Sequence, residues 1–82
     1  MEITFKLFDV SKDFKIATAE AEINLSYRTR FKCEVVYEKY ARQKDFVIIE
    51  IEINGDDNQI IEATKESEFI FSKYSRMVII HR

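Results

Sequence analysis

The sequence contains few of the residues that build turns, disulfides and metal sites. Its 82 residues include one glycine, one cysteine, one histidine and no proline or tryptophan. One glycine cannot make a glycine-rich phosphate loop, and one cysteine with one histidine cannot supply the four ligands of a structural zinc site. A single cysteine also cannot form an intramolecular disulfide, which suits a reducing compartment. We therefore expect no metal and no cofactor.

Long apolar runs and a strong net charge are also missing. No uninterrupted apolar run exceeds four residues, far short of a membrane span. The N-terminal sequence MEITFKLFDV carries an acidic second residue and lacks the apolar stretch of a signal peptide. The net charge of −2 gives no overall preference for nucleic acid or anionic membranes. We predict one globular cytoplasmic domain over residues 1–82, with no membrane association.

The clearest pattern that is present is an alternation of apolar and polar residues from residue 17 to residue 37. Only Thr29 among the odd positions and Val36 among the even positions break it. A period of two indicates extended backbone with one buried face. The stretch would span about 70 Å if fully extended, whereas a chain of this size has a radius of gyration of about 12 Å. The pattern therefore predicts a hairpin centred on Thr29.

The first part of this stretch allows a second interpretation. Ser11 could cap a helix that runs to Leu25, because alanine and glutamate are good helix formers. On a helical wheel, however, the apolar residues of this segment lie on opposite sides, so no single face is apolar. We favour a strand over residues 14–25, and the sequence leaves the helix open.

Alternation on either side of this stretch predicts further strands. Residues 2–8 form a short amphipathic strand. The strand over residues 45–53 should pair with the strand before it through a turn centred on Gln43, which places Tyr37 opposite Ile49. In this register, Ile48 falls on the face away from the core. We predict an antiparallel meander over residues 14–25, 30–40 and 45–53.

In the last third of the chain, the spacing of the apolar residues changes from the alternation of a strand to that of a helix. Its only glycine lies in the Asn54–Asn58 segment, which predicts a turn, and a short strand over residues 59–63 should follow. Apolar residues then fall on one arc of a helical wheel, before a uniformly apolar segment that is typical of a strand covered on both faces. The predicted fold class is α+β, a mostly antiparallel sheet of about five to six strands. One C-terminal helix over residues 65–76 packs on it, and a buried strand over residues 77–81 completes it.

No catalytic constellation is present. His81 lies next to the last residue, and Cys33 occupies an inward position of the alternation, where a small buried hydrophobe is expected. A Cys–His pair would also need a third group to orient the base. Glu50 and Glu52 alternate on the outer face of a predicted strand, without residues that form a pocket. We predict a protein that is not an enzyme and has no small-molecule substrate.

Charge is distributed unevenly along the chain. Residues 26–49 carry six basic and three acidic side chains, whereas residues 50–68 carry one basic and seven acidic ones. Aromatic residues lie between the basic ones, as in segments that bind nucleic acid. The candidate partner-binding or RNA-binding residues are Arg28, Arg30, Lys32, Lys39, Tyr40, Arg42 and Lys44. The candidate acidic protein-binding face consists of Glu50, Glu52, Asp56, Asp57 and Glu62.

These features favour a protein that acts by binding. We predict a small protein-binding module that regulates or inhibits another protein by steric or allosteric blockade. Small regulators encoded by viruses or mobile elements are often compact single domains of this kind. Edge strands and a second, partly apolar sheet face would also favour a homodimer. The alternative is a protein that binds RNA or single-stranded nucleic acid through residues 26–44.

Overall fold

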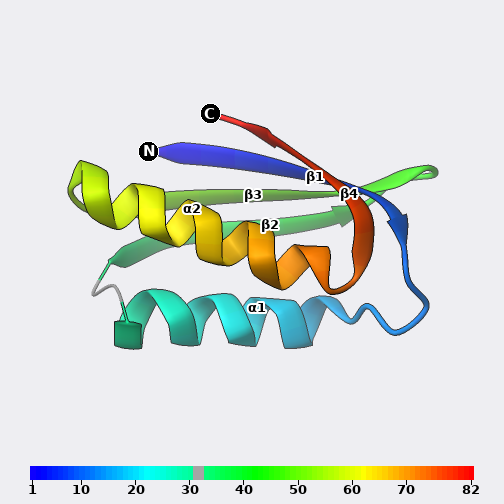
Figure 1. Cartoon of the computed structure of the whole chain (residues 1–82), viewed down its shortest axis with the longest axis horizontal. Coiled ribbons are helices and arrows are strands. Elements are labelled where there is room, and N and C mark those ends of the chain that lie inside the picture. The colour runs from blue at the N-terminus through cyan, green and yellow to red at the C-terminus, as the bar shows by residue number, and fades with distance from the viewer. Residues whose placement is uncertain (31–32) are drawn as a thin grey trace.

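The elements of the chain follow the order strand, helix, strand, strand, helix, strand (Figure 1). The computed structural model describes residues 1–30 and 33–82, except for the side chains of residues 29 and 30. The strands are β1 (Glu2–Val10), β2 (Glu34–Arg42), β3 (Phe46–Asn54) and β4 (Ser75–His81). The helices are α1 (Ile16–Leu25), which continues into a π-helical turn (Ser26–Arg30), and α2 (Asp57–Ser72).

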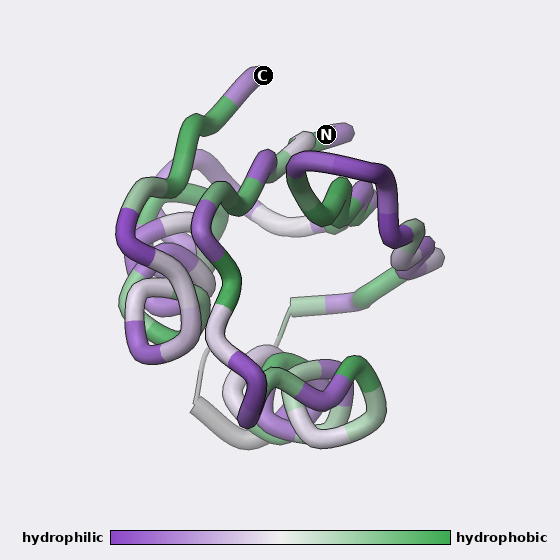
Figure 2. The backbone as a smooth tube through the Cα atoms, turned by 90° about the vertical axis from the view of Figure 1, so that its right-hand side faces the viewer, coloured by the Kyte–Doolittle hydropathy of each residue, from purple (hydrophilic) through white to green (hydrophobic). Residues whose placement is uncertain are grey.

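The four strands form one antiparallel sheet in the order β2-β3-β1-β4. Both β3 and β4 pair antiparallel with β1, and β2 pairs antiparallel with β3. Each helix therefore connects two strands that run parallel and lie on either side of a third. This is the split βαβ arrangement of ferredoxin-like folds. Both helices lie on the same face of the sheet, as the two views in Figures 1 and 2 show.

The face of the sheet that the helices cover is apolar along the full length of its two central strands. Phe5 of β1 meets Phe71 of α2 edge to face, with the ring centroids 5.0 Å apart. Tyr27 reaches the same core, and its hydroxyl forms a hydrogen bond with the Ser67 hydroxyl, so both buried polar groups are satisfied. The residues of the two central strands on this face are at most 1% exposed; they are Ile3, Phe5, Leu7, Val47, Ile49, Ile51 and Ile53.

Helix α1 replaces the strand that the alternation predicts over residues 14–25. Ala19 and Ile23 are its buried residues, and Tyr27 follows at the same spacing of four, which places all three on one side of the helix. Alanine at the other odd positions fits an exposed helical surface as well as a strand, so the alternation was misleading. The N-cap residue, Lys15, makes no side-chain capping hydrogen bond. The sequence signal that usually marks the start of a helix is therefore weak here.

The hairpin predicted about Thr29 is wrong, because the backbone of Thr29 belongs to the π-helical turn. The helix that the sequence left open is the one observed, and α1 ends at Leu25 as that alternative expects. It begins at Ile16 rather than at Ser11. The α+β class and the antiparallel sheet are confirmed, whereas the predicted strand number and the single helix are wrong.

The hairpin between β2 and β3 exists, but its register differs from the prediction by three residues. Tyr40, not Tyr37, lies opposite Ile49. An odd shift moves every side chain of a strand to the other face. Tyr37 therefore lies away from the helices and Tyr40 faces them. The sequence places the centre of the turn one to two residues too early, at Gln43, and it gives no signal for the bulge at Val36.

Helix α2 is longer than predicted and includes the residues assigned to a strand over 59–63. Asp56 caps it: the Asp56 carboxylate accepts a hydrogen bond from the Gln59 backbone N–H at 2.8 Å. The Gln59 side chain in turn accepts one from the Asp56 backbone N–H at 2.9 Å. This capping box starts the helix directly after the only glycine. The helix ends at Ser72, four residues before the predicted end at residue 76.

Strand β4 was predicted to be covered on both faces, but it lies at an edge of the sheet. Val78 and Ile80 lie on the helix side and are half-buried, whereas Met77 on the other face is 50% exposed. A short apolar run does not distinguish an edge strand from a central one. The order of the strands in the sheet decides whether β4 lies at an edge, and that order cannot be predicted from the sequence pattern.

Candidate functional site

The face of the sheet opposite the helices, called the open face here, is not covered by any described element (Figure 2). The strand registers arrange its side chains in rows that run across the sheet from β2 to β4. Even-numbered residues of β1 and β3 occupy this face, since the odd-numbered ones fill the core. From one end to the other, the rows are Tyr37, Glu52 and Glu2; Lys39, Glu50, Thr4 and His81; Ala41, Ile48, Lys6 and Ile79; and Phe46, Phe8 and Met77.

The last two rows contain the apolar half of the open face, defined as Phe8, Phe46, Ile48, Met77 and Ile79. The rings of Phe8 and Phe46 are in contact, with centroids 5.4 Å apart. Met77 and Ile79 at the edge are 50% and 39% exposed. Phe8, Phe46 and Ile48 are half-buried, so the five side chains together form a partly exposed apolar patch. Such patches mark interaction surfaces more often than isolated apolar residues do. The apolar half is therefore the strongest candidate for a contact surface.

The first two rows form the charged half of the open face. Tyr37 donates a hydrogen bond from its hydroxyl to Glu2 Oε2 at 2.9 Å, and this bond raises the pKa of Tyr37. Lys39 lies directly opposite Glu50. Glu2, Glu50 and Glu52 together outnumber the two lysines of the face, which are Lys6 and Lys39. This excess of carboxylates favours contact with basic groups.

The basic residues that the sequence singles out do not share one surface. Lys39 lies on the open face, whereas Tyr40 and Arg42 lie on the helix side of β2. Lys44 lies in the turn between β2 and β3, and Arg28 is exposed in the turn after α1. The side chain of Arg30 and the whole of Lys32 lie outside the described residues.

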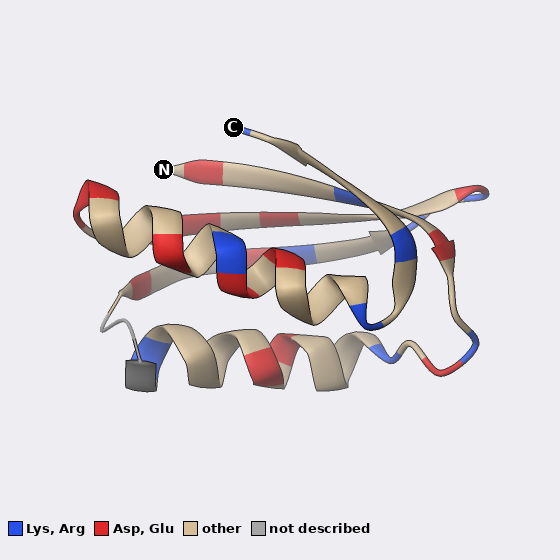
Figure 3. Cartoon of the chain, in the orientation of Figure 1, with Lys and Arg blue, Asp and Glu red and all other residues tan. Residues whose placement is uncertain are grey.

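The acidic residues that the sequence singles out divide into two groups. Glu50 and Glu52 lie next to each other on the open face of β3. Asp56 and Asp57 lie at the N-terminus of α2, where Asp56 caps the helix, and Glu62 is exposed on the helix itself (Figure 3). Only the first group belongs to the open face.

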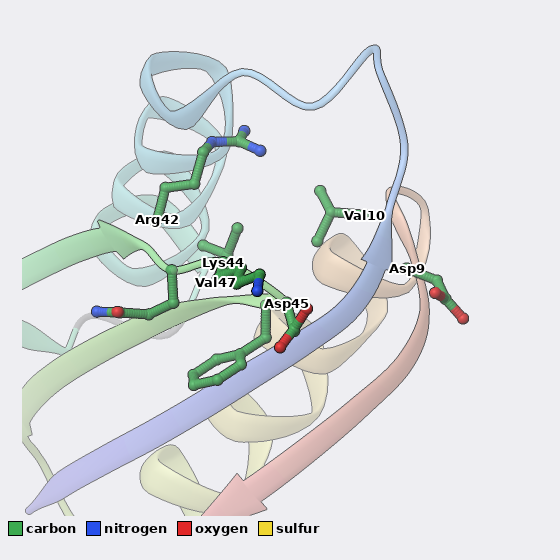
Figure 4. A pocket seen from close by; sticks show the side chains of 8 residues that line it. Asp9, Val10, Arg42, Lys44, Asp45 and Val47 are labelled. Carbon is green, nitrogen blue, oxygen red and sulfur yellow. The ribbon is translucent and has the colours of Figure 1, made fainter.

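A hollow of about 300 Å³ lies between the β2–β3 turn and the end of β1 (Figure 4). Two basic side chains, Arg42 and Lys44, and two acidic ones, Asp9 and Asp45, line it. Asp9 has a backbone φ of 52°, in the left-handed region that aspartate tolerates better than most residues. Because the charges are balanced, the hollow has no clear preference for a phosphate or a cation.

The helix side of β2 holds a carboxyl group that the sequence did not single out. Glu38 accepts a hydrogen bond from Asn24 Nδ2 at 3.1 Å through Oε2. Its Oε1 is buried and has no hydrogen-bond partner among the described residues. Burial, together with the nearby Glu20 carboxylate, raises the pKa of Glu38 to about 7. Glu38 was missed because the predicted register placed it on the outer face.

The hydroxyl of Tyr40 lies on the same side of β2 and is also buried without a partner among the described residues. Burial raises the pKa of Tyr40, and the carboxylates of Glu38 and Glu20 add to the effect. Side chains with shifted pKa values occur at functional sites and also in structural clusters. Together with Asn24, these side chains form a polar group between α1 and the edge strand β2.

Chemistry at the cysteine or at a metal finds no support in the described residues. Cys33 is buried, and burial raises the pKa of its thiol, so its reactive thiolate form is disfavoured. No group of three or more histidine, cysteine, aspartate or glutamate side chains is placed to hold a metal in the part of the chain that is described. None of the described helices is long and apolar enough to cross a membrane.

The solved structures that share the fold include a designed protein and one domain of an enzyme. The chain aligns over its whole length with a de novo designed protein, Ferredog-Diesel, with a TM-score of 0.59 and 15% identity, and covers 85% of it. It aligns over 98% of its length with formyltetrahydrofolate deformylase from Burkholderia mallei, with a TM-score of 0.54 and 16% identity, but spans 27% of that chain. Identities this low show a common fold alone. No family model matches the chain, and no curated protein matches it.

Proposed function

We propose that this chain is a small non-enzymatic protein-binding module, which regulates or inhibits another protein by covering part of that protein's surface. The contact surface is the open face of the sheet. One observation carries the proposal: five apolar side chains of three strands lie together on a face that no described element covers. Folding does not require them there, because the core lies on the opposite face.

The composition of the open face supports protein as the ligand. Protein interfaces have an apolar centre rich in aromatic residues and methionine, surrounded by a polar rim. Phe8, Phe46 and Met77 supply the centre, and the charged half supplies one side of the rim. All of these side chains project from a hydrogen-bonded sheet, so little conformational freedom is lost on binding.

The distribution of charge on the open face defines the partner's chemistry. Glu52 lies four residues along β3 from Ile48, which corresponds to about 13 Å. The complementary surface has an apolar centre and, about 7 to 13 Å from it, basic side chains that meet Glu2, Glu50 and Glu52. Blockade is steric, because the open face is the broad surface of a sheet.

Binding of RNA or single-stranded nucleic acid is the second candidate. It is favoured by the two phenylalanine rings on the central strands and by Lys6, whose Nζ lies 5.7 Å from the centroid of the Phe46 ring. The three carboxylates of the charged half oppose it, because they would repel phosphate groups that follow the strands. We therefore place protein first.

Affinity capture with and without nuclease tests the choice, using wild type and the variant Phe46→Glu. Wild type should retain one dominant protein that survives nuclease treatment, and Phe46→Glu should retain at least tenfold less. Phe69→Glu is the matched control: Phe69 is 64% exposed on α2, away from the open face, and this variant should capture normally. Circular dichroism should show all three chains folded.

Two results would overturn the proposal. If Phe46→Glu captures the partner as well as Phe69→Glu does, the open face is not the contact. If the retained material is nucleic acid, or disappears with nuclease, the second candidate is the function, and the salt dependence of binding then measures how many phosphates are contacted.

A further inference from the structure

The two edges of the sheet differ in their suitability for pairing with another strand. On β2, a bulge at Val36 interrupts the register, and charged residues occur along its length. On β4, the register with β1 is constant from His81 to Ser75, and Arg76 is the only charged residue between Ser75 and Ile80. Bulges and charges protect an edge, whereas a flat apolar edge is a template for a further strand.

We propose that β4 pairs antiparallel with β4 of a second copy of the chain about a two-fold axis, with Val78 opposite the partner's Val78. The two sheets then join into one sheet of eight strands. This inference goes beyond the proposed function, because the pairing needs no other protein. The axis makes the contact closed, so it produces a dimer and not a filament.

The side-chain pattern of β4 selects this register. On the open face, Met77 meets the partner's Ile79, and on the helix side Arg76 meets the partner's Ile80. A register one residue later, centred on Ile79, would place Arg76 opposite the partner's Arg82, and like charges directly opposite are destabilising. A register centred on Met77 would leave Ile80 and His81 beyond the end of the partner's strand.

Pairing in this register also joins the apolar halves of the two open faces. The row that ends in Phe8 and Met77 continues into the partner's Ile79 and Lys6, and the symmetric row does the same. One apolar band then crosses the middle of the joined sheet, and the two charged halves lie on opposite sides of it. Met77, half exposed in the single chain, becomes surrounded by apolar neighbours.

We assign the strand that pairs with β4 to a second copy of the chain because β4 is complementary to itself. Apolar residues meet apolar residues on the open face, and the single charge, Arg76, meets no like charge. Pairing of β4 with the β2 edge of another copy would be heterologous, and the bulge at Val36 would interrupt its ladder. A β-strand from a different protein remains as an outcome that the experiment detects.

Disulfide trapping tests the register. A chain carrying Met77→Cys is mixed with a chain of different mass carrying Ile79→Cys, under mild oxidation. Directly opposite Cβ atoms are about 5 Å apart, close enough for a disulfide after small shifts, whereas diagonal ones are about 7 Å or more apart. The mixed disulfide should form at least tenfold faster than either self-disulfide. The native Cys33 is buried, so wild type should show little cross-linking.

A matched pair on the other edge controls for random collisions. Chains carrying Tyr37→Cys and Lys39→Cys, on the open face of β2, should form no preferred mixed disulfide. If Ile79→Cys cross-links mainly to itself, or if the β2 pair reacts as fast as the β4 pair, the proposed register is overturned.

Sedimentation equilibrium of the full chain tests the dimer itself. Wild type should have the mass of a dimer, and Ile79→Lys, which places a charge beside the partner's Met77, should weaken the dimer at least tenfold. The matched control is Val36→Lys, at an exposed apolar residue of the other edge, and it should remain dimeric. A wild-type chain that is monomeric at every concentration overturns the proposal, as does a β4 edge that cross-links only to a captured protein.

The variant Phe46→Glu separates this inference from the proposed function. Phe46 lies on β3, two strands away from the β4 edge. It should lose the captured partner and keep the dimer mass. If it keeps both, the proposed function fails while the dimer stands; if wild type captures a partner as a monomer, the dimer fails while the proposed function stands.

Discussion

The helix-covered face and the open face are made by alternate residues of the same strands, yet they differ in kind. In β1, Ile3, Phe5 and Leu7 point into the core, while Thr4 and Lys6 between them do not. The covered face of the central strands is apolar from end to end, but the open face is apolar only in the half near the β2–β3 turn. Folding explains the first pattern, and the proposed binding function would explain the second.

The covered face carries polar residues on its edge strands, and β2 is the clearest case. Glu38 and Tyr40 lie on this face directly opposite Ile51 and Ile49 of β3. Both side chains leave a buried oxygen without a partner among the described residues. The comparison between the faces therefore predicts where substitutions cost stability, where they are neutral, and where they improve it.

The largest difference should appear between two isoleucines of β3. Ile51→Ala removes a fully buried side chain and should lower the free energy of unfolding by about 2 to 5 kcal/mol. Ile48→Ala, on the open face, should cost about 1 kcal/mol or less. Urea denaturation followed by circular dichroism measures both. Equal losses would mean that the open face is buried in the folded chain, for instance in a dimer.

The next effect depends on pH and comes from Glu38. Its pKa rises from an ordinary 4.5 to about 7 on folding, so its protonated form stabilises the fold. That stabilisation is fully present below pH 4.5 and is lost as the pH rises to about 7. Glu38→Gln should therefore be more stable than wild type at pH 8, by about 1 to 2 kcal/mol because solvent screens part of the effect at this half-buried group, and nearly equal to it at pH 4.

The control for this prediction is Glu62→Gln, at an exposed residue of α2. Its unfolding free energy should follow that of wild type across the pH range. The interpretation of Glu38 would be wrong if both variants gave the same pH profile, because the effect would then come from net charge and not from burial.

A smaller effect distinguishes two tyrosines that point toward the helices. Tyr27→Phe removes a buried hydrogen bond with Ser67 and should cost about 1 kcal/mol. Tyr40→Phe removes a buried hydroxyl that has no partner among the described residues, so it should be neutral or stabilising by up to about 1 kcal/mol. Thermal unfolding of the two variants compares them directly, and a larger loss in Tyr40→Phe would show that its hydroxyl is bonded.

The smallest effect is expected on the open face. Tyr37→Phe removes an exposed hydrogen bond to Glu2 and should leave the urea midpoint of unfolding unchanged. Titration of the tyrosine absorbance gives a second measurement, since this hydrogen bond raises the pKa of Tyr37 in the wild type. A clear fall in the urea midpoint would mean that the charged half contributes to folding.

The candidate site was only partly visible in the sequence. Alternation placed Ile48 on the face away from the core, and the structure confirms that position. Phe8 and Phe46 became neighbours only through the pairing of β1 with β3, which joins segments almost forty residues apart. Met77 and Ile79 joined them because β4 lies at the edge next to β1. A linear pattern contains no information on which strands are adjacent.

The sequence by itself determined the local features whose signals are strong and short in range. Strict alternation located β1 and β3, and their apolar residues form the centre of the core. The α+β class with an antiparallel sheet followed from such patterns. The alanines of α1 gave no such signal, because alanine suits both a helix and a strand position, and burial of Ile23 and Tyr27 against the sheet selected the helix.

Only the tertiary structure decided the strand order, the register of β2 and the identity of the open face. Each depends on contacts between residues far apart in the chain, whose energies exceed local preferences. A bulge of one residue and a turn displaced by one or two residues exchanged the sides of Tyr37 and Tyr40. Because a side chain's face decides whether it is buried or offered to a partner, the surface proposed for binding emerges from the packed sheet.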